Sequence, residues 1–308
     1  MRASRQLFSR GARNALLTAA AASLATACTD VVELDSAFEE ARPVVDAWLT
    51  DAAGAQTVYL SRSQDYYAEA LPAPITGAEV VVCRGDAAAP TCLAFAERDD
   101  APGAYVWEPR GDERLGAVGD TFDLLVALPD DRRLTARSVM RRVPAIDSIS
   151  FQFEESELGL DEGVYAQVYA RDPPGTGDRY LIRSTINGTP LNRPSEITLA
   201  ADAAFDGGTA SDGIAFILPI RFGVNELDDD GAAVPLEPGD RVAVEVWSLN
   251  EEAFRFLRSA VEQITNGESI LFSVPVVSTP GNVVDLDAGE RALGMFSVSA
   301  VSAAADTL

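Results

Sequence analysis

Short hydrophobic segments separated by turn residues dominate the chain and restrict it to β architectures. Between residues 41 and 143, seven segments alternate apolar and polar side chains, and Gly, Pro or Asp bounds each of them. They are 42–49, 56–63, 77–83, 92–97, 104–108, 121–128 and 133–140. Seven short strands within about 100 residues predict an immunoglobulin-like β-sandwich, with Trp48 and Trp107 in its core.

A second strand-rich region, residues 144–308, follows the junction at residues 143–146. Its expected strands are 147–154, 163–170, 179–187, 212–222, 241–248, 269–277 and 293–301. They show the same short, turn-bounded pattern. The predicted fold class is therefore mostly β, with the N-terminal β-sandwich domain at 41–143 and a second β-rich domain at 144–308.

One helix is predicted in the second domain, at about residues 251–266. Asn250 suits the N-cap position, and Gly267 suits the stop after the last turn. The apolar side chains on one face are Phe254, Leu257, Val261 and Ile264. Such a face predicts that the helix docks on a sheet.

The first 28 residues have the pattern of an export signal that ends in a lipid attachment site. Residues 1–14 carry four arginines and no acid, residues 15–27 are apolar or small, and Cys28 follows. This order defines a signal peptide over residues 1–27. A cysteine at the cleavage point is typical of bacterial lipoproteins, and ordinary signal peptidase would cut the same bond. We expect lipidation of Cys28 and an acidic tether over residues 28–40.

Cys83 and Cys92 flank a short loop between two predicted strands. In a hairpin they would lie opposite each other and form a disulfide, which suits an oxidising compartment. Two free buried thiols are the alternative.

The composition excludes several kinds of chemistry. The chain has no His, all 24 basic residues are Arg, and 48 residues are acidic, which gives a formal net charge of −24. Without His and Lys there is no Ser–His–Asp triad, Schiff base or ordinary zinc site. We therefore expect no enzyme, with a hydrolase that uses only carboxylates as the alternative. Nucleic acid is not an expected partner, because its phosphates would meet like charge.

The same acidity predicts a salt-loving source. A charge of this size destabilises a compact chain by self-repulsion, and concentrated salt screens that repulsion.

One acidic segment approximates the spacing of a calcium-binding loop. Within ELDDDGAAVPLE, the candidate ligands are Glu226, Asp228, Asp230 and Glu237. Alternate carboxylates can surround Ca²⁺ while Gly231 permits a sharp turn. A solvated acidic turn between strands is the alternative, and no other cofactor is expected.

Two further loops carry recognisable local patterns, a tyrosine pair and a turn motif. Tyr66 and Tyr67 stand beside a proline-rich connection, where paired tyrosines can contact a ligand or partner. Packing against the end of the sandwich explains them equally. Residues 171–175, RDPPG, read as a turn whose chemistry requires no ligand.

The order of the segments carries a family resemblance. The relevant stretches are Cys28 with VVELD, then RPVVDAWLTD, VYLSRSQDYY, ITGAEVVV, GAYVWEP, PAIDSISFQFEE, ARDPPGTGDRYLIR, EPGDRVAVEVWSLNEEAFRFL and ALGMFSV. In this order they resemble the Bacteroidetes-type lipoprotein family called domain of unknown function 4249. The N-terminal half is also similar to carboxypeptidase regulatory-like and transthyretin-like sandwiches.

The resemblance implies a surface-exposed outer-membrane lipoprotein. Family members are often encoded near TonB-dependent transporters, which implies an accessory or ligand-binding partner of such a nutrient transporter. A structural or adhesive cell-surface lipoprotein without a transport role is the alternative. The family supplies no catalytic residues and no ligand. Asp30, Glu33 and Asp35 resemble acidic signals for export to the cell exterior.

Overall fold

The computed structural model describes most of the chain that follows the predicted tether. The described residues are 41–65, 68–85, 89–156, 161–203, 212–216, 220–221, 223–267 and 279–308. The predicted signal peptide, Cys28 and the tether lie outside them, as do Tyr66, Tyr67 and the predicted strand at 269–277.

Ten strands form the first sheet, in the order β15-β14-β7-β6-β3-β4-β5-β2-β1-β16. Their bounds are β1 (Pro43–Thr50), β2 (Gln56–Arg62), β3 (Glu79–Arg84), β4 (Thr91–Arg98), β5 (Ala101–Trp107), β6 (Thr121–Ala127), β7 (Arg133–Val139), β14 (Val284–Asp285), β15 (Glu290–Arg291) and β16 (Leu293–Ser299). All seven strands predicted for the N-terminal half are present.

The first sheet folds over its own core at β4. This strand pairs with β3 through Thr91–Phe95 and with β5 through its last residues, with an irregular register between Glu97 and Arg98. Side chains from both halves, such as Val45 of β1 and Leu124 of β6, are fully buried in one cluster. The two halves also meet at their far edges, where Val298 N donates a hydrogen bond to Ser138 Oγ at 3.0 Å. The predicted sandwich is therefore present.

Strand β16 returns from the C-terminal part of the chain and pairs in parallel with β1. The sequence assigned these residues to the second β-rich region, whereas their backbone hydrogen bonds join them to the first sheet. The approach is close: a Cβ added at Gly294, where φ is +94°, would lie 1.9 Å from Val45 O. Local alternation cannot identify a partner strand about 250 residues away in sequence, which is why the prediction missed this pairing.

The second sheet is built around β10 (Arg179–Ile186) and β13 (Arg241–Ser248). Its order is β11-β10-β13-β17, and β12 also pairs with β10. The remaining bounds are β11 (Thr189–Leu191), β12 (Thr198–Ala201) and β17 (Val301–Thr307), with a 3-10 helix η1 at Pro194–Glu196. A separate hairpin joins β8 (Ile146–Glu154) to β9 (Gly163–Ala170). Its side chains share a second core with β10 and β13.

The strand predicted at 212–222 needs a correction. Within the described part of this segment, only Ala215 and Ile220 form isolated bridges, with Arg171 and Val168 respectively. Gly213 has a positive φ of 70°, which opposes a continuous strand at the start of this segment.

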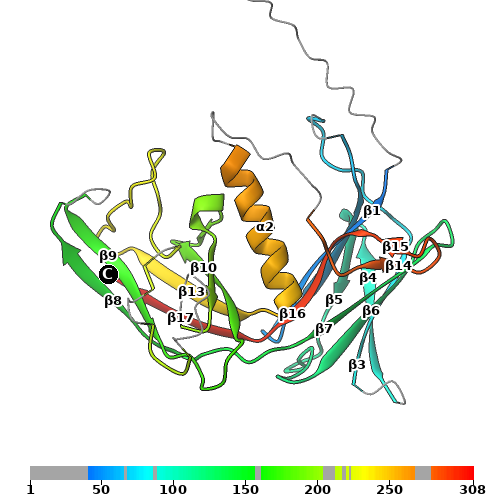
Figure 1. Cartoon of the computed structure of the whole chain (residues 1–308), viewed down its shortest axis with the longest axis horizontal. Coiled ribbons are helices and arrows are strands. Elements are labelled where there is room, and N and C mark those ends of the chain that lie inside the picture. The colour runs from blue at the N-terminus through cyan, green and yellow to red at the C-terminus, as the bar shows by residue number, and fades with distance from the viewer. Residues whose placement is uncertain are drawn as a thin grey trace, which may run out of the picture. The chain divides into compact units, whose positions relative to one another are not determined.

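Helix α2 (Glu251–Gly267) covers part of the second sheet. Asn250 caps it as predicted, because Ala253 N donates to Asn250 Oδ1 at 2.7 Å. Figure 1 shows α2 lying beside β10 and β16, both of which it contacts. Docking uses the first turns, where Ala253 and Phe254 are buried, whereas Ile264, predicted on the docking face, is 51% exposed. The fold class, mostly β with one packed helix, is confirmed.

In the part of the chain that the structure describes, no helix is both long and apolar enough to cross a membrane.

Candidate functional site

The two faces of β1 have different environments, because successive side chains of a strand point to opposite sides. Val45 and Leu49 are fully buried in the core of the first sheet. Asp46, Trp48 and Thr50 alternate with them and face the other way. That second face forms the wall of a pocket.

We call this pocket the aromatic pocket. It has a volume of about 250 Å³ and is lined by Asp46, Trp48, Thr50, Ala55, Gln56, Thr57, Tyr59 and Trp247. Most of these residues lie on β1, on β2 or between the two, while Trp247 comes from β13 of the second sheet. Three aromatic side chains from three strands thus meet one carboxylate.

The rings of Trp48 and Trp247 are held by their neighbours. Trp48 is half-buried and packs against Phe256 of α2, with ring centroids 6.2 Å apart. Trp247 Nε1 donates a hydrogen bond to Glu245 Oε2 at 2.8 Å. The guanidinium carbon of Arg183 lies 4.8 Å from the Trp247 ring centroid, within the range of a cation–π interaction.

The two N-terminal tryptophans pack against different hydrophobic cores. Trp107 is 8% exposed and belongs to the core of the first sheet, as predicted. Trp48 lies on the opposite face of its strand, where it packs against the cluster that contains Trp247 and Phe254 and also lines the aromatic pocket. Both are core residues in part, but the prediction did not distinguish the two faces.

Asp46 carries the one carboxylate among the residues that line the pocket. The residue keeps solvent exposure, but burial of its carboxylate raises its pKa, and a side-chain hydrogen bond with Trp48 acts in the opposite direction. Among the residues placed in the structure, no Arg lies within ion-pair distance of it, whereas Asp123 contacts Arg137 at 2.7 Å. The pocket thus holds an exposed carboxylate that has no cationic partner among the described residues.

A hydrogen bond connects the two strands along the polar wall of the pocket. Gln56 is 7% exposed, and its Oε1 accepts a hydrogen bond from Thr50 N at 2.7 Å. This bond links the start of β2 to the end of β1. Asp46 and Tyr59 lie directly opposite each other in the antiparallel pairing of the same two strands.

A second polar group, which we call the Arg142 cluster, consists of Arg142, Asp172, Asp178, Asp202 and Asp212. Oxygens of Asp172, Asp202 and Asp212 all lie within 4.8 Å of one another. Arg142 Nε donates to both oxygens of Asp178, at 2.9 and 3.0 Å. Burial raises the pKa of the Asp172 carboxyl.

The carboxylates of the Arg142 cluster are engaged by the loop they surround. Asp202 Oδ1 accepts hydrogen bonds from Gly177 N and Asp178 N at 2.8 and 2.9 Å. Asp212 Oδ1 accepts one from Gly175 N at 2.7 Å. Arg142 also donates to the carbonyls of residues 173–175. The cluster therefore holds the predicted turn at 171–175, and a structural role accounts for it.

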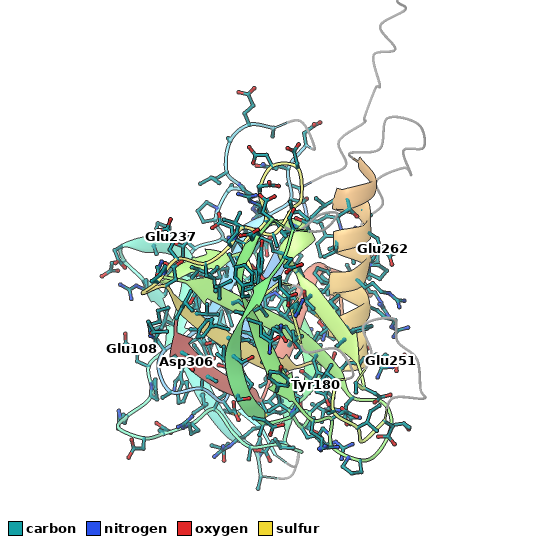
Figure 2. All side chains as sticks on the ribbon, turned by 90° about the vertical axis from the view of Figure 1, so that its left-hand side faces the viewer. Glu108, Tyr180, Glu237, Glu251, Glu262 and Asp306 are labelled. Atoms are coloured by element: carbon teal, nitrogen blue, oxygen red, sulfur yellow. A yellow bond between two sulfur atoms is a disulfide. The ribbon has the colours of Figure 1, made fainter. Side chains whose placement is uncertain are left out.

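Tyr180 also contacts this cluster, through Asp172. It is fully buried, and its hydroxyl donates to Asp172 Oδ1 at 2.5 Å. Burial raises the pKa of Tyr180, so the phenol stays protonated. Figure 2 labels it together with the exposed acids Glu108, Glu237, Glu251, Glu262 and Asp306.

The predicted calcium ligands lie on an exposed hairpin and do not converge. Asp228 N donates to Ala232 O at 2.8 Å, and Val234 N to Glu226 O at 2.8 Å. Asp228 Oδ1 accepts hydrogen bonds from Asp230 N and Ala232 N. The described residues contain one group of three carboxylates close enough to share a cation, and it includes none of Glu226, Asp228, Asp230 and Glu237. Calcium binding here stays a prediction.

The predicted disulfide is present. Cys83 of β3 and Cys92 of β4 lie directly opposite each other and are bonded, which removes the alternative of two free thiols. The other predicted site residues, Cys28, Tyr66 and Tyr67, lie outside the described residues.

Sequence reasoning missed the aromatic pocket for a definable reason. The signal was the run D-x-W-x-T at 46–50, with polar and aromatic residues opposite an apolar face. It indicates a second buried or functional face. Trp247 lies about 200 residues further along the chain, and only the packing of β13 against this region brings it there.

Comparison with known proteins gives one family and a distant structural likeness. The crystal structure of the chicken CNTN1 FN1–FN3 domains is 10% identical, covers 69% of this chain and 61% of that chain, and has a TM-score of 0.22. The chain thus spans about three fifths of that structure. No curated protein matches the chain. The family described as Domain of unknown function (DUF4249) matches residues 29–304, so the chain belongs to this family.

Proposed function

We propose that this protein is a lipid-anchored outer-membrane protein that binds a small ligand for a TonB-dependent nutrient transporter. The observation that carries the proposal is the aromatic pocket. Three aromatic side chains and one carboxylate line this pocket together with two threonines, an alanine and a glutamine, and concave sites that combine aromatic rings with polar groups are typical of ligand binding. The family match over residues 29–304 begins directly after Cys28, which supports an anchored globular body.

The pocket favours binding over catalysis. Hydrolysis of a glycoside by carboxylates needs two such groups on either side of the scissile bond. The pocket lining contributes Asp46 alone, beside neutral Thr and Gln side chains. We therefore propose a binding protein without enzymatic activity.

The proposed anchor sets where the pocket operates. Lipid on Cys28 would hold the chain at the outer membrane, facing the exterior. Residues 28–40 span at most about 45 Å when fully extended. The body therefore stays within reach of a barrel embedded in the same membrane, which is the proposed partner. A surface with a net charge of −24 would repel nucleic acid.

The test is a mild-detergent pull-down from native outer membranes at the salt concentration of the source, followed by mass spectrometry. We expect a stoichiometric TonB-dependent barrel to be recovered together with an N-terminal lipid-modified peptide that begins at Cys28. A Cys28→Ser variant should lose the membrane fraction altogether. Recovery of the lipoprotein alone, with barrels present but unbound, would instead indicate a structural or adhesive surface protein.

Calcium remains a separate proposal for the hairpin that contains Asp228. Calorimetry with Ca²⁺ should give heat that disappears in Asp228→Asn, because this carboxylate is the central one of the set. An absence of heat, or heat unchanged in the variant, would reject the site.

A further inference from the structure

Asp46 differs from the paired acids of this chain. Asp178 and Asp287 contact Arg142 and Arg133 at 2.5 and 2.8 Å. Asp46 takes part in no ion pair among the described residues, although burial of its carboxylate raises its pKa. Asp46 is an exposed residue, so a ligand can reach its carboxylate from solvent. A positively charged ligand would supply the counter-charge that the described residues do not.

The aromatic rings that line the pocket with Asp46 also favour a positively charged ligand. The faces of aromatic rings carry partial negative charge and attract cations, with indole the strongest. The described residues already show this property at Trp247, which Arg183 contacts, and at Phe254, which Arg179 and Arg258 contact. Tyr59 is 54% exposed, so its ring remains accessible from solvent. A carboxylate and three aromatic rings together disfavour an anion.

The size of the pocket limits the ligand. Its volume of about 250 Å³ lies below the range of about 300–1,000 Å³ that drug-sized molecules occupy. A small alkylated ammonium group fits this space and sheds water more readily than a metal ion or a primary ammonium does. An inorganic cation would retain its hydration shell and gain little from the rings.

We propose that the aromatic pocket binds a small organic cation, with an alkylated ammonium group against Trp48, Tyr59 and Trp247 and beside the Asp46 carboxylate. This inference rests on the proposed function, since it names the ligand class of the same site. The rings supply the cation–π contacts, and Asp46 supplies the counter-charge.

The experiment compares two probes of the same shape. Choline carries a quaternary ammonium, and 3,3-dimethylbutan-1-ol replaces its nitrogen with carbon and is neutral. Calorimetry on the lipid-free body at the salt concentration of the source should give choline binding at least tenfold tighter than binding of the neutral alcohol. Methyl α-D-glucopyranoside is the third probe, because aromatic rings and carboxylates also recognise sugars.

Three variants locate the effect. Asp46→Asn should weaken choline binding at least fivefold and leave the neutral alcohol unchanged, while Tyr59→Ala should weaken choline by a similar factor. Asp147→Asn is the matched control, because it removes the same charge from an exposed position on β8 outside the pocket. It should change choline affinity by less than twofold. Circular dichroism establishes that each variant is folded.

The outcomes separate the ligand class from the function. Equal affinity for choline and the neutral alcohol, or choline binding unchanged in Asp46→Asn, overturns the organic-cation proposal. Glucoside binding that requires Tyr59 while choline fails overturns it too, but leaves a ligand-binding pocket and therefore the proposed function. Absence of binding by all three probes also rejects the organic cation, and the pull-down then decides the function independently.

Discussion

The aromatic pocket and the Arg142 cluster hold aspartates in opposite ways. In the cluster, Arg142 and the backbone of the surrounding loop occupy the oxygens of Asp178 and Asp202. In the pocket, the described residues offer Asp46 aromatic rings and one hydrogen bond but no cation. The carboxylates of the cluster are engaged within the chain, whereas we propose that a ligand completes the pocket. Acidic residues that lie close together are therefore not by themselves a sign of a binding site.

The largest effect that this comparison predicts is on the stability of the Arg142 cluster. Arg142→Leu leaves Asp178, 4% exposed, without its counter-charge and frees three loop carbonyls. We expect a loss of about 3 kcal/mol in the free energy of unfolding, at the lower end of the range for broken buried pairs because Arg142 keeps solvent contact. Urea unfolding measures it.

Arg137→Leu is the control for this variant. Arg137 forms an ion pair with Asp123 on an exposed strand face, and its side chain is 67% exposed. Its loss should cost less than about 1 kcal/mol. Equal costs for the two variants would contradict a structural role for the cluster.

The disulfide should stabilise the fold without shaping the pocket. Replacing Cys83 and Cys92 together with Ser removes a short crosslink, for an expected loss of about 2–3 kcal/mol. Neither β3 nor β4 lines the aromatic pocket, so choline affinity in the folded double variant should match that of the wild type. Thermal unfolding and calorimetry on the same sample check both statements. A large loss of affinity would show that the pocket depends on the distant hairpin.

The smallest predicted effect is on the stability of the Asp46→Asn variant. This substitution should stabilise the fold, whereas Arg142→Leu should destabilise it. Since the folded state raises the pKa of Asp46, the ionised form opposes folding at neutral pH. Asp46→Asn should raise Tm by about 1–2 °C at pH 7, after allowance for the exposure of this residue.

The pH dependence gives this prediction its control. The penalty is absent where Asp46 is protonated in both states, so the Tm difference should vanish well below about pH 4, grow as pH rises from the ordinary Asp pKa to the raised one, and stay constant above it. Scanning calorimetry of both proteins across this range measures it. A variant less stable than the wild type at pH 7 would mean that Asp46 has a stabilising partner within the protein.

Local features of the fold were predictable from the sequence, and distant ones were not. Alternation located strands such as β1 and β6, Asn250 identified the start of α2, and the spacing of Cys83 and Cys92 identified their bond. The parallel pairing of β16 with β1 depends on contacts between distant segments. Those contacts depend on packing rather than on local propensity.

The candidate site shows the same limit. The pattern of residues 46–50 indicated a strand with apolar side chains on one face and polar or aromatic side chains on the other. The sequence could not show that Trp48 lines a pocket on its second face. Calcium binding stays a prediction, and the hairpin with the predicted spacing turns Asp228 Oδ1 toward the N–H groups of Asp230 and Ala232. Spacing along the chain does not by itself bring the carboxylates of a site together.

The most direct test of ligand binding is to identify what the aromatic pocket retains from the cell's own small molecules. The wild-type body, immobilised and exposed to the small-molecule fraction of a native culture, is compared by mass spectrometry with the Asp46→Asn, Tyr59→Ala double variant and with Asp147→Asn. We expect a compound enriched at least tenfold by the wild type and by Asp147→Asn, and lost from the double variant. Retention of the same compounds by all three proteins would contradict a ligand-binding role for this pocket.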